Sequence, residues 1–408
     1  MDWSFLIEGK DAICVSTDSR NLPEGCIFVA LKGETFDGNQ YALQALKQGA
    51  SMAIVDDEQV YAAIQEAGEY SALLVENSLQ ALQDLARAWR RHLGTPIIGI
   101  TGTNGKTTTK ELLAAVLSTK FKTHYTQGNL NNSIGVPLTL LQLTREHELA
   151  IVEMGASHPG DIKELVEVAE PNCGLITNVG KAHLQGFGSF EGVMKTKAEL
   201  YDYLRAHGGF CFRNTDNPHL AQMAGDLKTV AYTSGTMPEG TQLVGAYNSE
   251  NIQAALCVGE HFGVSRDRGL EAIRAYVPSN NRSQRMQTEK NTLIVDAYNA
   301  NPTSMTAAIQ AFEDLKIQAP KAYILGAMRE LGEYSHTEHQ NIVNMLLERK
   351  ADTVLLVGDE YRETTAPYPI FSNVNELCEH LKQQPITGCT ILIKGSRSNK
   401  LEQVLPLL

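Results

Sequence analysis

The chain has 408 residues, of which 43% are hydrophobic and 20% charged, and its formal net charge at pH 7 is −12. A chain of this length and composition forms several domains with substantial cores and does not resemble a disordered protein. The negative charge argues against a protein that binds nucleic acid through a basic surface, although local basic groups can still bind an anionic substrate.

The first predicted unit, residues 1–80, contains short elements separated by turn-rich segments. Apolar periodicity and turn residues predict helices over 41–49 and 59–67 and strands over 53–55 and 72–75. A unit of this size is too small for a catalytic core of its own. We therefore expect it to be a binding module.

The second predicted unit, residues 81–288, is a larger α/β unit. An amphipathic helix over 82–93 precedes a β-branched strand over 97–100, and a glycine-rich turn joins this strand to a helix over 111–117. The alternation continues with strands over 149–154, 174–178 and 210–212 and helices over 161–169 and 190–204. Strands that alternate with helices predict a parallel sheet with right-handed crossovers.

The third predicted unit, residues 289–408, repeats this alternation. Its strands are expected over 292–295, 322–325, 353–357 and 390–393, and its helices over 304–315, 337–349 and 374–381. The pattern predicts a second doubly wound sheet. No GxGxxG follows its first strand, so dinucleotide binding is not expected there. The whole chain is thus expected to be an α/β protein of three domains.

The seven cysteines are scattered and contain no CxxC pair. This pattern favours reduced thiols in an intracellular protein over a disulfide framework or a zinc site. The N-terminal segment has no basic region followed by an apolar run, and no stretch reaches the roughly 18 apolar residues of a membrane span. We expect a cytoplasmic protein without membrane insertion and without a nucleic-acid partner.

The segment GITGTNGKTTT (99–109) lies between a predicted strand and a predicted helix, which is the setting of a phosphate-binding loop. Glycines allow backbone N–H groups to approach phosphate oxygens, and the helix N-terminus favours negative charge. Lys106 can reach the β- and γ-phosphates, and the hydroxyl of Thr107 can hold Mg²⁺. The glycine spacing departs from GxxxxGK[ST], and a solvated turn is the alternative. The order of strand, loop and helix favours an ATP-binding site.

Three further side chains are candidates for the same chemistry. Glu153 ends a predicted buried strand, where ligands of parallel sheets collect, so it can bind Mg²⁺. His183 follows the next strand and is either a second metal ligand or a hydrogen-bonded loop residue. Lys197 lies on a predicted helix, where a solvated charged face is the simpler interpretation.

The central motifs, in chain order, resemble those of the Mur ligases of peptidoglycan synthesis. They are GITGTNGKTTTKELL, GNLNNSIGVPLTLL, VEMGASHPGDI, ITNVGKAHLQGFGS and KTKAEL. Segments outside the centre resemble the members that join D-alanyl-D-alanine to UDP-N-acetylmuramoyl-tripeptide. These segments are STDSR (16–20), IFVALKGETFDGN (27–39), VDAYNANPTSM (295–305), LGAMRELG (325–332) and KGSRS (394–398). The resemblance covers essentially the whole chain.

The resemblance implies a domain division and a reaction. A small N-terminal α/β domain (1–80) would bind the UDP-sugar, and a central P-loop domain with a parallel sheet (81–288) would bind ATP. A C-terminal Rossmann-like domain (289–408) would contact the nucleotide and the dipeptide. The peptide carboxylate would attack ATP to give an acyl phosphate, which the amine of D-alanyl-D-alanine would then attack. Separately from the resemblance, we expect a monomer.

The resemblance also implies roles for individual residues. The expected catalytic residues are Lys106, Glu153, His183 and Lys197, the last as a possible carbamate, and the expected Mg²⁺ ligands are Thr107, Glu153 and His183. Expected ATP contacts are Gly102, Thr103, Asn104, Gly105, Lys106, Thr107, Thr108, Asn131, Asn132, Arg285, Asp296 and Asn299. Expected substrate contacts are Ser19, Arg20, Lys32, Phe36, Asp37, Asn301, Ser396 and Arg397. The chain departs from the family pattern at Asn39, where a histidine is common, and at Gln185, where a glutamate is common.

Other activities compete with this interpretation. Folylpolyglutamate synthase or another Mur ligase is a near alternative, but the first-domain segments favour a UDP-sugar over folate and the C-terminal segments favour a dipeptide. A regulatory P-loop NTPase or kinase would leave the first domain and the Lys197 segment unexplained. A binding module without activity would not need Lys106, Thr107 and Glu153.

Overall fold

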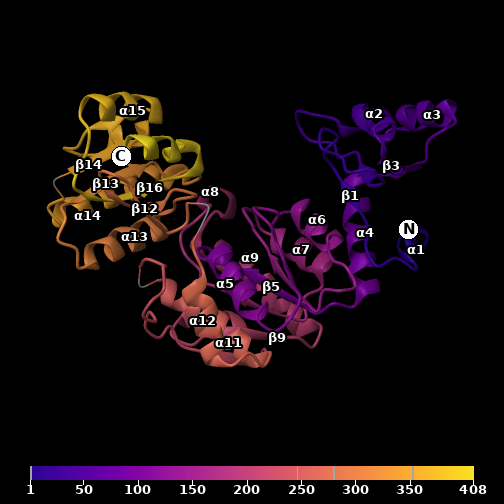
Figure 1. Ribbon diagram of the computed structural model, residues 1–408, viewed down its shortest axis with the longest axis horizontal. Helices are drawn as coiled ribbons and strands as arrows, with labels where there is room; N and C mark the ends of the chain where they lie inside the picture. The colour runs from indigo at the N-terminus through magenta and orange to yellow at the C-terminus, as the bar shows by residue number, and fades with distance from the viewer. Residues whose placement is uncertain (1, 246, 279–280, 352) are drawn as a thin grey trace.

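The computed structural model describes residues 2–245, 247–278, 281–351 and 353–408. Three sheets follow one another along the chain, each with its own helices, as the sequence predicts for a three-domain α/β protein (Figure 1).

The first sheet has the order β1-β2-β3-β4 and is parallel throughout. Its strands are β1 (Val15–Ser16), β2 (Ile27–Val29), β3 (Met52–Val55) and β4 (Ala72–Leu74). Helices α2 (Ala42–Lys47) and α3 (Glu58–Ala67) pack against these strands, and η1 (Gly38–Tyr41) leads into α2. The short helix α1 (Ser4–Ile7) precedes the sheet in the chain.

One cysteine pair corrects the expectation that all seven thiols are reduced. Cys14 and Cys26 form a disulfide, and their Cα atoms are 4.5 Å apart. Each residue immediately precedes one of two strands that pair in parallel, with Val15 opposite Ile27. This register brings the two cysteines together at a separation that a disulfide can bridge. The other five cysteines are free.

The central sheet contains six parallel strands in the order β10-β9-β8-β5-β7-β6. They are β5 (Ile97–Thr101), β6 (Thr123–Tyr125), β7 (Leu149–Glu153), β8 (Cys173–Ile176), β9 (Phe210–Asn214) and β10 (Thr229–Tyr232). The helices of this part are α4 (Ser78–Leu93), α5 (Lys106–Leu117), α6 (Gly135–Leu141), α7 (Asp161–Ala169), α8 (Leu184–Phe187), α9 (Phe190–Ala206), α10 (Pro218–Ala224), α11 (Asn248–His261) and α12 (Arg266–Ala275).

Strand β5 lies in the middle of this sheet, and every residue of β5 is buried. Its two neighbours, β7 and β8, come later in the chain, so the strand order reverses beside β5. In parallel sheets, ligands bind beyond the carboxyl ends of the strands at such a reversal. The glycine-rich loop that follows β5 therefore occupies the expected ligand-binding position.

Helix α11 has no counterpart among the elements predicted from the sequence. Most of its length is buried, including polar Asn248 and Asn251 at its start and Ile252 and Leu256 further along. A helix buried on several sides lacks the polar stripe that makes a helical period visible in a sequence. The helix packs against α5, which carries the glycine-rich loop at its start.

The third sheet has the order β11-β12-β16-β13-β14-β15, and only β11 is antiparallel to its neighbour. Its strands are β11 (Gln284–Gln287), β12 (Thr292–Asp296), β13 (Lys321–Gly326), β14 (Thr353–Val357), β15 (Ile370–Phe371) and β16 (Thr390–Lys394). Its helices are α13 (Pro302–Asp314), η2 (Gly332–Tyr334), α14 (Ser335–Glu348), η3 (Asp359–Glu363), α15 (Val374–Gln383), η4 (Arg397–Asn399) and η5 (Leu401–Leu407).

Strand β11 lies before the predicted domain boundary at 288/289, yet it hydrogen-bonds to β12 in the third sheet. The third sheet therefore includes residues that the sequence assigns to the central unit. The hairpin of β11 and β12 explains the difference, because an antiparallel edge strand does not continue the strand–helix alternation on which the division rests. The exact domain limits stay a prediction.

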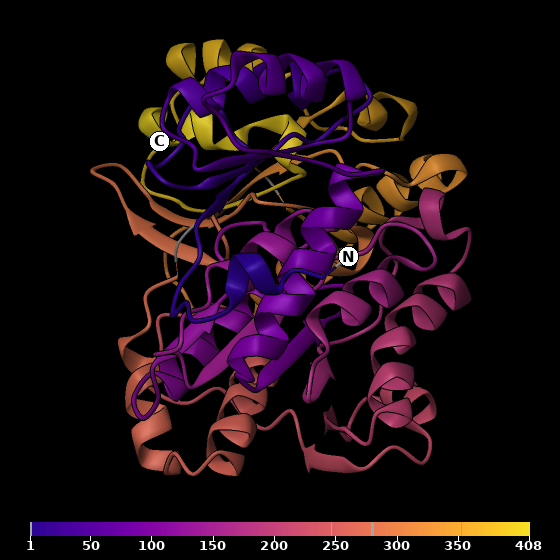
Figure 2. The same cartoon turned by 90° about the vertical axis from the view of Figure 1, so that its right-hand side faces the viewer.

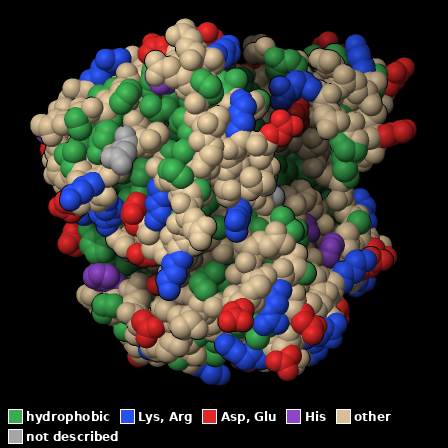
Figure 3. Space-filling model, turned by 60° about the vertical axis from the view of Figure 1, so that its left-hand side comes forward, with side chains coloured by type: hydrophobic (Ala, Val, Ile, Leu, Met, Phe, Trp, Pro, Cys, Tyr) green, Lys and Arg blue, Asp and Glu red, His purple; other side chains and the backbone are tan. Residues whose placement is uncertain are grey.

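Two perpendicular views show how the three parts lie. The β1–β4 sheet and the β11–β16 sheet both lie above the central sheet (Figures 1 and 2). Acidic and basic side chains are interspersed over the face in Figure 3, without a broad basic surface. Within the described ranges, no helix has both the length and the apolar character of a membrane span.

Candidate active site

The loop after β5 has a backbone that requires glycine at two positions. Gly102 has a φ of 145°, and a Cβ atom there would lie 2.0 Å from Oγ1 of Thr177. Gly105, which caps α5, has a φ of 79°, and a Cβ atom would lie 2.5 Å from Oδ1 of Asn251. Both conformations are strained for residues with side chains. The unusual glycine spacing therefore still forms a tight loop that leads directly into a helix.

The loop is held from behind by the segment that follows β8. The backbone N–H of Thr103 donates to the carbonyl oxygen of Asn178 at 2.9 Å. The backbone N–H of Asn104 donates to the side-chain Oδ1 of Asn178 at 3.0 Å. Thr177 donates through Oγ1 to the carbonyl oxygen of Asn104 at 2.6 Å. These N–H groups are thus occupied. An anion at this loop would meet the N–H groups of the first turn of α5, which lack partners within the helix.

The Lys106 side chain lies over this loop. Its Nζ donates to the carbonyl oxygens of Gly102 (2.7 Å) and Thr103 (3.1 Å). Burial lowers the pKa of Lys106, while the nearby Glu153 carboxylate opposes that shift. A cation in this position can turn from carbonyl oxygens to phosphate oxygens when a nucleotide binds.

Glu153 is the last residue of β7 and is only 2% exposed. Its Oε1 accepts hydrogen bonds from Asn131 Nδ2 (2.8 Å) and Thr107 Oγ1 (3.2 Å). Its Oε2 is buried and has no hydrogen-bond partner. A buried carboxylate oxygen without a partner is rare in proteins, and a cation would satisfy it. This oxygen, with the Thr107 hydroxyl beside it, suits Mg²⁺.

In the part of the chain that is described, no three His, Cys, Asp or Glu side chains gather into a metal-binding cluster. This is compatible with Mg²⁺, which often takes one or two carboxylates and completes its shell with water and substrate phosphates. The Glu153 carboxylate and the Thr107 hydroxyl are oxygen ligands of the kind that Mg²⁺ takes.

His183 precedes α8 and has a φ of 49° in the left-handed region. Its Nδ1 pairs with the carboxylate of Glu330, which belongs to the segment after β13 in the third domain. Burial lowers the pKa of His183, and Glu330 opposes that shift. His183 lines the same cavity as Thr107 and Glu153. The structure thus brings the three predicted metal ligands to one cavity.

Lys197 lies on α9 and is only 2% exposed, so its segment is not the solvated helix face of the simpler interpretation. Its Nζ lies 5.4 Å from the centre of the Phe187 ring. Burial, and next the charge of Lys106, lower the pKa of Lys197 to about 7. Lys197 therefore lies close to Lys106 in the fold, although it is not among the residues that line the cavity.

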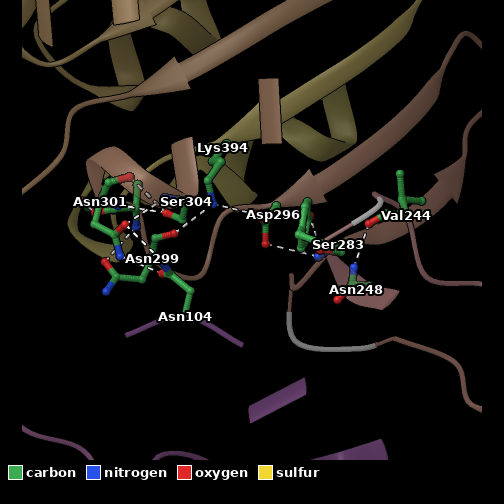
Figure 4. Close-up of polar contacts among 12 residues, drawn as sticks. Asn104, Val244, Asn248, Ser283, Asp296, Asn299, Asn301, Ser304 and Lys394 are labelled. Atoms are coloured by element: carbon green, nitrogen blue, oxygen red, sulfur yellow. Dashed lines mark hydrogen bonds and ion pairs between the residues drawn. The ribbon is translucent and has the colours of Figure 1, made fainter. Parts of the chain in front are cut away.

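The third domain contributes polar side chains from the loop after β12 (Figure 4). Asp296 accepts a hydrogen bond from Lys394 Nζ at 2.6 Å through Oδ2. Asn301 caps α13 and also donates through Nδ2 to Oδ1 of Asn104 at 2.8 Å. Asn104 belongs to the glycine-rich loop. The central and third domains therefore touch directly at the phosphate-binding loop.

A cavity of about 720 Å³ lies between these two domains. Its walls include most of the residues predicted to bind nucleotide or metal, namely Thr103, Asn104, Gly105, Lys106, Thr107, Thr108, Asn131, Asn132, Glu153, His183, Asp296, Asn299 and Asn301. Gly102 is buried behind the loop. Asn132 also accepts a hydrogen bond from the N–H of Gly135 at 2.8 Å and so holds the start of α6.

Several residues that line the cavity were not predicted from the sequence. Arg282 is the most important of them, because it brings a second cation to the phosphate-binding loop. Its guanidinium lies 3.7 Å from the centre of the Tyr298 ring, and its Nε is buried without a hydrogen-bond partner. Burial is the main cause of the lowered pKa of Lys106, and the charge of Arg282 adds to it. The other missed cavity residues are Tyr247, Asn248, Asn251 and Tyr298. The N-x-x-N spacing at 248–251, which places both amides on one helix face, could have indicated two of them.

Arg285 is not brought to this cavity. It lies within β11, opposite Ile294, and its side chain is exposed. It lines a different cavity, together with Leu243 and Val244. Among the described residues, Arg282 rather than Arg285 is the arginine beside the phosphate-binding loop. The two differ because Arg282 precedes the strand, whereas Arg285 is fixed in the ladder of an edge strand.

The predicted dipeptide-binding residues lie at the margin of the site. Ser396 is buried, and its Oγ accepts from the N–H of Arg329 (3.2 Å) and donates to the carbonyl oxygen of Ala300 (3.4 Å). Arg397 is exposed, and its guanidinium lies 5.2 Å from the centre of the Tyr298 ring. Ser396 thus connects two loops, while Arg397 is free to meet a carboxylate.

The predicted UDP-binding residues lie in the first domain, away from the cavity (Figure 1). Arg20 is exposed and pairs with Asp18. Lys32 and Asp37 form an ion pair at 3.3 Å, the Phe36 ring beside them is 56% exposed, and Ser19 is partly buried. Asn39, one of the two departures from the family pattern, is buried and donates to Asp37 (2.8 Å) and Asp56 (2.7 Å).

Comparison with known proteins identifies related chains over nearly the full length. Family models described as the Mur ligase catalytic domain, the Mur ligase middle domain and the Mur ligase glutamate ligase domain match residues 13–90, 100–239 and 281–397. The chain is 34% identical to UDP-N-acetylmuramoyl-tripeptide–D-alanyl-D-alanine ligase of Bacillus subtilis, covering 96% of this chain and 92% of that one. It is 35% identical to the Escherichia coli protein of the same name, covering 98% and 95%.

Solved structures agree with these relatives. The structure of MurF ligase from Thermotoga maritima in complex with ADP matches with a TM-score of 0.86 and 27% identity, over 98% of each chain. A crystal structure of MurF from Acinetobacter baumannii matches with a TM-score of 0.83 and 29% identity, over 96% of this chain and 92% of that one. The similarity extends through all three sheets.

Proposed function

The chain belongs to the Mur ligase family, and on that premise we propose that it joins D-alanyl-D-alanine to UDP-N-acetylmuramoyl-tripeptide in peptidoglycan synthesis. The protein is an ATP-dependent ligase. The observation that carries the proposal is the cavity in which the phosphate-binding loop and Glu153 face the loop of Asp296 and Asn299. A regulatory NTPase would have no need of a third domain that meets the nucleotide in this way.

The family resemblance supplies the reaction, and the charges of the cavity are compatible with it. The carboxylate of the tripeptide attacks the γ-phosphorus of ATP, and ADP leaves, which gives an acyl phosphate. The amine of D-alanyl-D-alanine then attacks the acyl carbon, loses a proton, and phosphate leaves. Lys106 and Arg282 would stabilise the negative charge that gathers on the transferring phosphoryl group. Ser396 and Arg397 would hold the carboxylate of the dipeptide, for which a guanidinium is well suited.

Two Mg²⁺ ions are part of the proposal. The unpartnered Oε2 of Glu153, the hydroxyl of Thr107 and the imidazole of His183 are the protein groups that would hold them. When bound, Mg²⁺ would offset the repulsion between the triphosphate and the attacking carboxylate. We also propose a carbamate on Lys197, because its lowered pKa provides the neutral amine that carbon dioxide requires.

The first domain would hold the UDP-sugar through Ser19, Arg20 and the segment from Lys32 to Asn39, as the family resemblance suggests. Half-exposed Phe36 offers an aromatic face for a ring of the substrate. The cytoplasmic location and the monomeric state expected from the sequence remain predictions. Sedimentation at several protein concentrations would test the monomeric state.

The acceptor distinguishes this activity from that of other Mur ligases. We expect phosphate release that requires ATP, Mg²⁺, UDP-N-acetylmuramoyl-tripeptide and D-alanyl-D-alanine together. D-alanine or an L-amino acid should support far less release, because each polar group left unpaired in the site costs about 1–3 kcal/mol. Equal rates with D-alanine and the dipeptide, measured by coupled phosphate assay, would reject the dipeptide assignment.

Arg282 and Arg285 have different expected roles. Arg282→Ala should lower kcat by about 10²–10³-fold, because it removes a cation from beside the transferring phosphoryl group. Arg285→Ala is the matched control and should keep a rate close to that of the unaltered enzyme. The Arg285 side chain is exposed to solvent and lines a different cavity. Steady-state kinetics of both variants would decide the assignment. A large loss of kcat in Arg285→Ala together with a near-normal kcat in Arg282→Ala would assign the phosphate-binding role to Arg285 instead.

A further inference from the structure

The loop of residues 180–185 in the central domain is held by the third domain. The N–H of Lys181 donates to Oγ1 of Thr303 at 3.1 Å. Lys181 Nζ forms an ion pair with Oε1 of Glu338 at 2.8 Å, and Glu338 is only 7% exposed. The same loop carries His183 and also backs the phosphate-binding loop, where the N–H of Gly180 donates to Oγ1 of Thr103 at 3.0 Å. Contacts from the third domain can therefore influence the catalytic centre directly.

Glu330 makes two further contacts with this loop. Its carboxylate pairs with Nδ1 of His183, and its carbonyl oxygen accepts a hydrogen bond from the N–H of Gln185 at 3.3 Å. Glu330 has a φ of 62°, in the left-handed region that residues with side chains seldom adopt. Such a conformation persists only where the surrounding structure holds it. The loop 180–185 has no carboxylate of its own, so Glu330 supplies the one that faces His183.

The chemistry of this pair selects one form of the histidine. An ionised carboxylate can only accept a hydrogen bond, so the proton at the contact belongs to Nδ1 of His183. In the neutral ring, Nε2 then keeps the lone pair that a metal ligand requires. A carboxylate behind a metal-binding histidine fixes both the tautomer and the orientation of the ring. The side chain of Phe187, whose ring centre lies 6.2 Å from that of His183 in an edge-on arrangement, limits the ring from another side.

We propose that Glu330 is the positioning residue of His183, and that this carboxylate of the third domain prepares the imidazole Nε2 for Mg²⁺. The metal site is then complete only while the central and third domains are in contact. This inference rests on the proposed function, in which His183 is a metal ligand. It adds a residue 147 positions away in the sequence whose effect on the metal is indirect.

The test is metal binding by the full chain rather than turnover. Mn²⁺ titrations in the presence of a non-hydrolysable ATP analogue, followed by electron paramagnetic resonance, report the affinity. Glu330→Ala should weaken Mn²⁺ binding about 10–100-fold, as removal of such outer partners commonly does. Glu330→Gln should recover most of that loss, because its amide oxygen can accept the same N–H. The Glu330 side chain is 57% exposed, so these changes leave the core intact.

Two control variants separate positioning from other effects. Glu333→Gln removes an exposed charge from the same segment and should bind Mn²⁺ as the unaltered protein does. Glu338→Gln weakens the same domain interface without touching His183, so its loss of Mn²⁺ affinity should be much smaller than that of Glu330→Ala. Equal losses in Glu338→Gln and Glu330→Ala would assign the effect to domain contact and overturn the proposal.

Nitrogen-15 resonances of His183 provide an independent readout. The unaltered protein should carry the imidazole proton on Nδ1, and Glu330→Ala should shift the proton toward Nε2. An unchanged tautomer, or unchanged Mn²⁺ affinity in Glu330→Ala, would overturn the proposal. Failure of the proposed function would instead appear as an unaltered enzyme that lacks dipeptide-dependent phosphate release.

Discussion

Lys106→Ala is expected to abolish turnover while binding of the UDP-substrate remains almost intact. The Lys106 ammonium lies over the phosphate-binding loop, where it would stabilise charge on the transferring phosphoryl group. Loss of one such preorganised donor commonly lowers the rate by about 10²–10³-fold or more. The predicted UDP-binding residues belong to a different domain, so their affinity for the substrate should not change.

Phosphate release and calorimetry with the UDP-substrate check these two expectations together. Lys163→Ala is a suitable control, because Lys163 is an exposed lysine of the same domain. A Lys106→Ala enzyme with near-normal phosphate release would contradict the role of the loop. Loss of UDP-substrate binding in the same variant would contradict the assignment of the two sites to separate domains.

Lys197→Ala is expected to lose most activity, by about 10–100-fold, if Lys197 acts as a carbamate near the metal site. The neutral amine adds to carbon dioxide and releases a proton, which leaves an anionic carbamate. Because burial and the charge of Lys106 lower the pKa of Lys197 to about 7, the amine is mostly neutral above that pH. Carbamate formation should therefore increase as the pH rises through 7, and activity should depend on dissolved carbon dioxide.

Short carboxylic acids provide the decisive measurement for Lys197. Acetate or formate added to Lys197→Ala should restore part of the activity by occupying the place of the carbamate. Lys195 lies two residues earlier on α9 and is exposed, so Lys195→Ala is the matched control. This variant should keep its activity, and added acetate or formate should not change that activity. Nearly full activity of Lys197→Ala without added acid would show that the buried lysine has only a packing role.

The elements that the sequence predicts correctly are those whose signals are local. Strand β5, the glycine-rich loop and α5 are consecutive, and each shows in its own residues. Helices α3, α7 and α15 have an apolar face and a polar face, so their period is visible. The short strands β1 and β2 and the buried helix α11 were missed because they lack such patterns. The order of several motifs along the chain was sufficient for the family.

By itself, the sequence determined the α/β class, the ATP-binding loop with Lys106 and Thr107, and the membership of the Mur ligase family. The tertiary structure decided which side chains meet. It placed Arg282 rather than Arg285 beside Lys106, joined Cys14 to Cys26, and set Glu330 against His183. Contacts of this kind depend on strand register and on the packing of domains, which join residues far apart in the chain. A local pattern of amino acids therefore does not predict these long-range contacts.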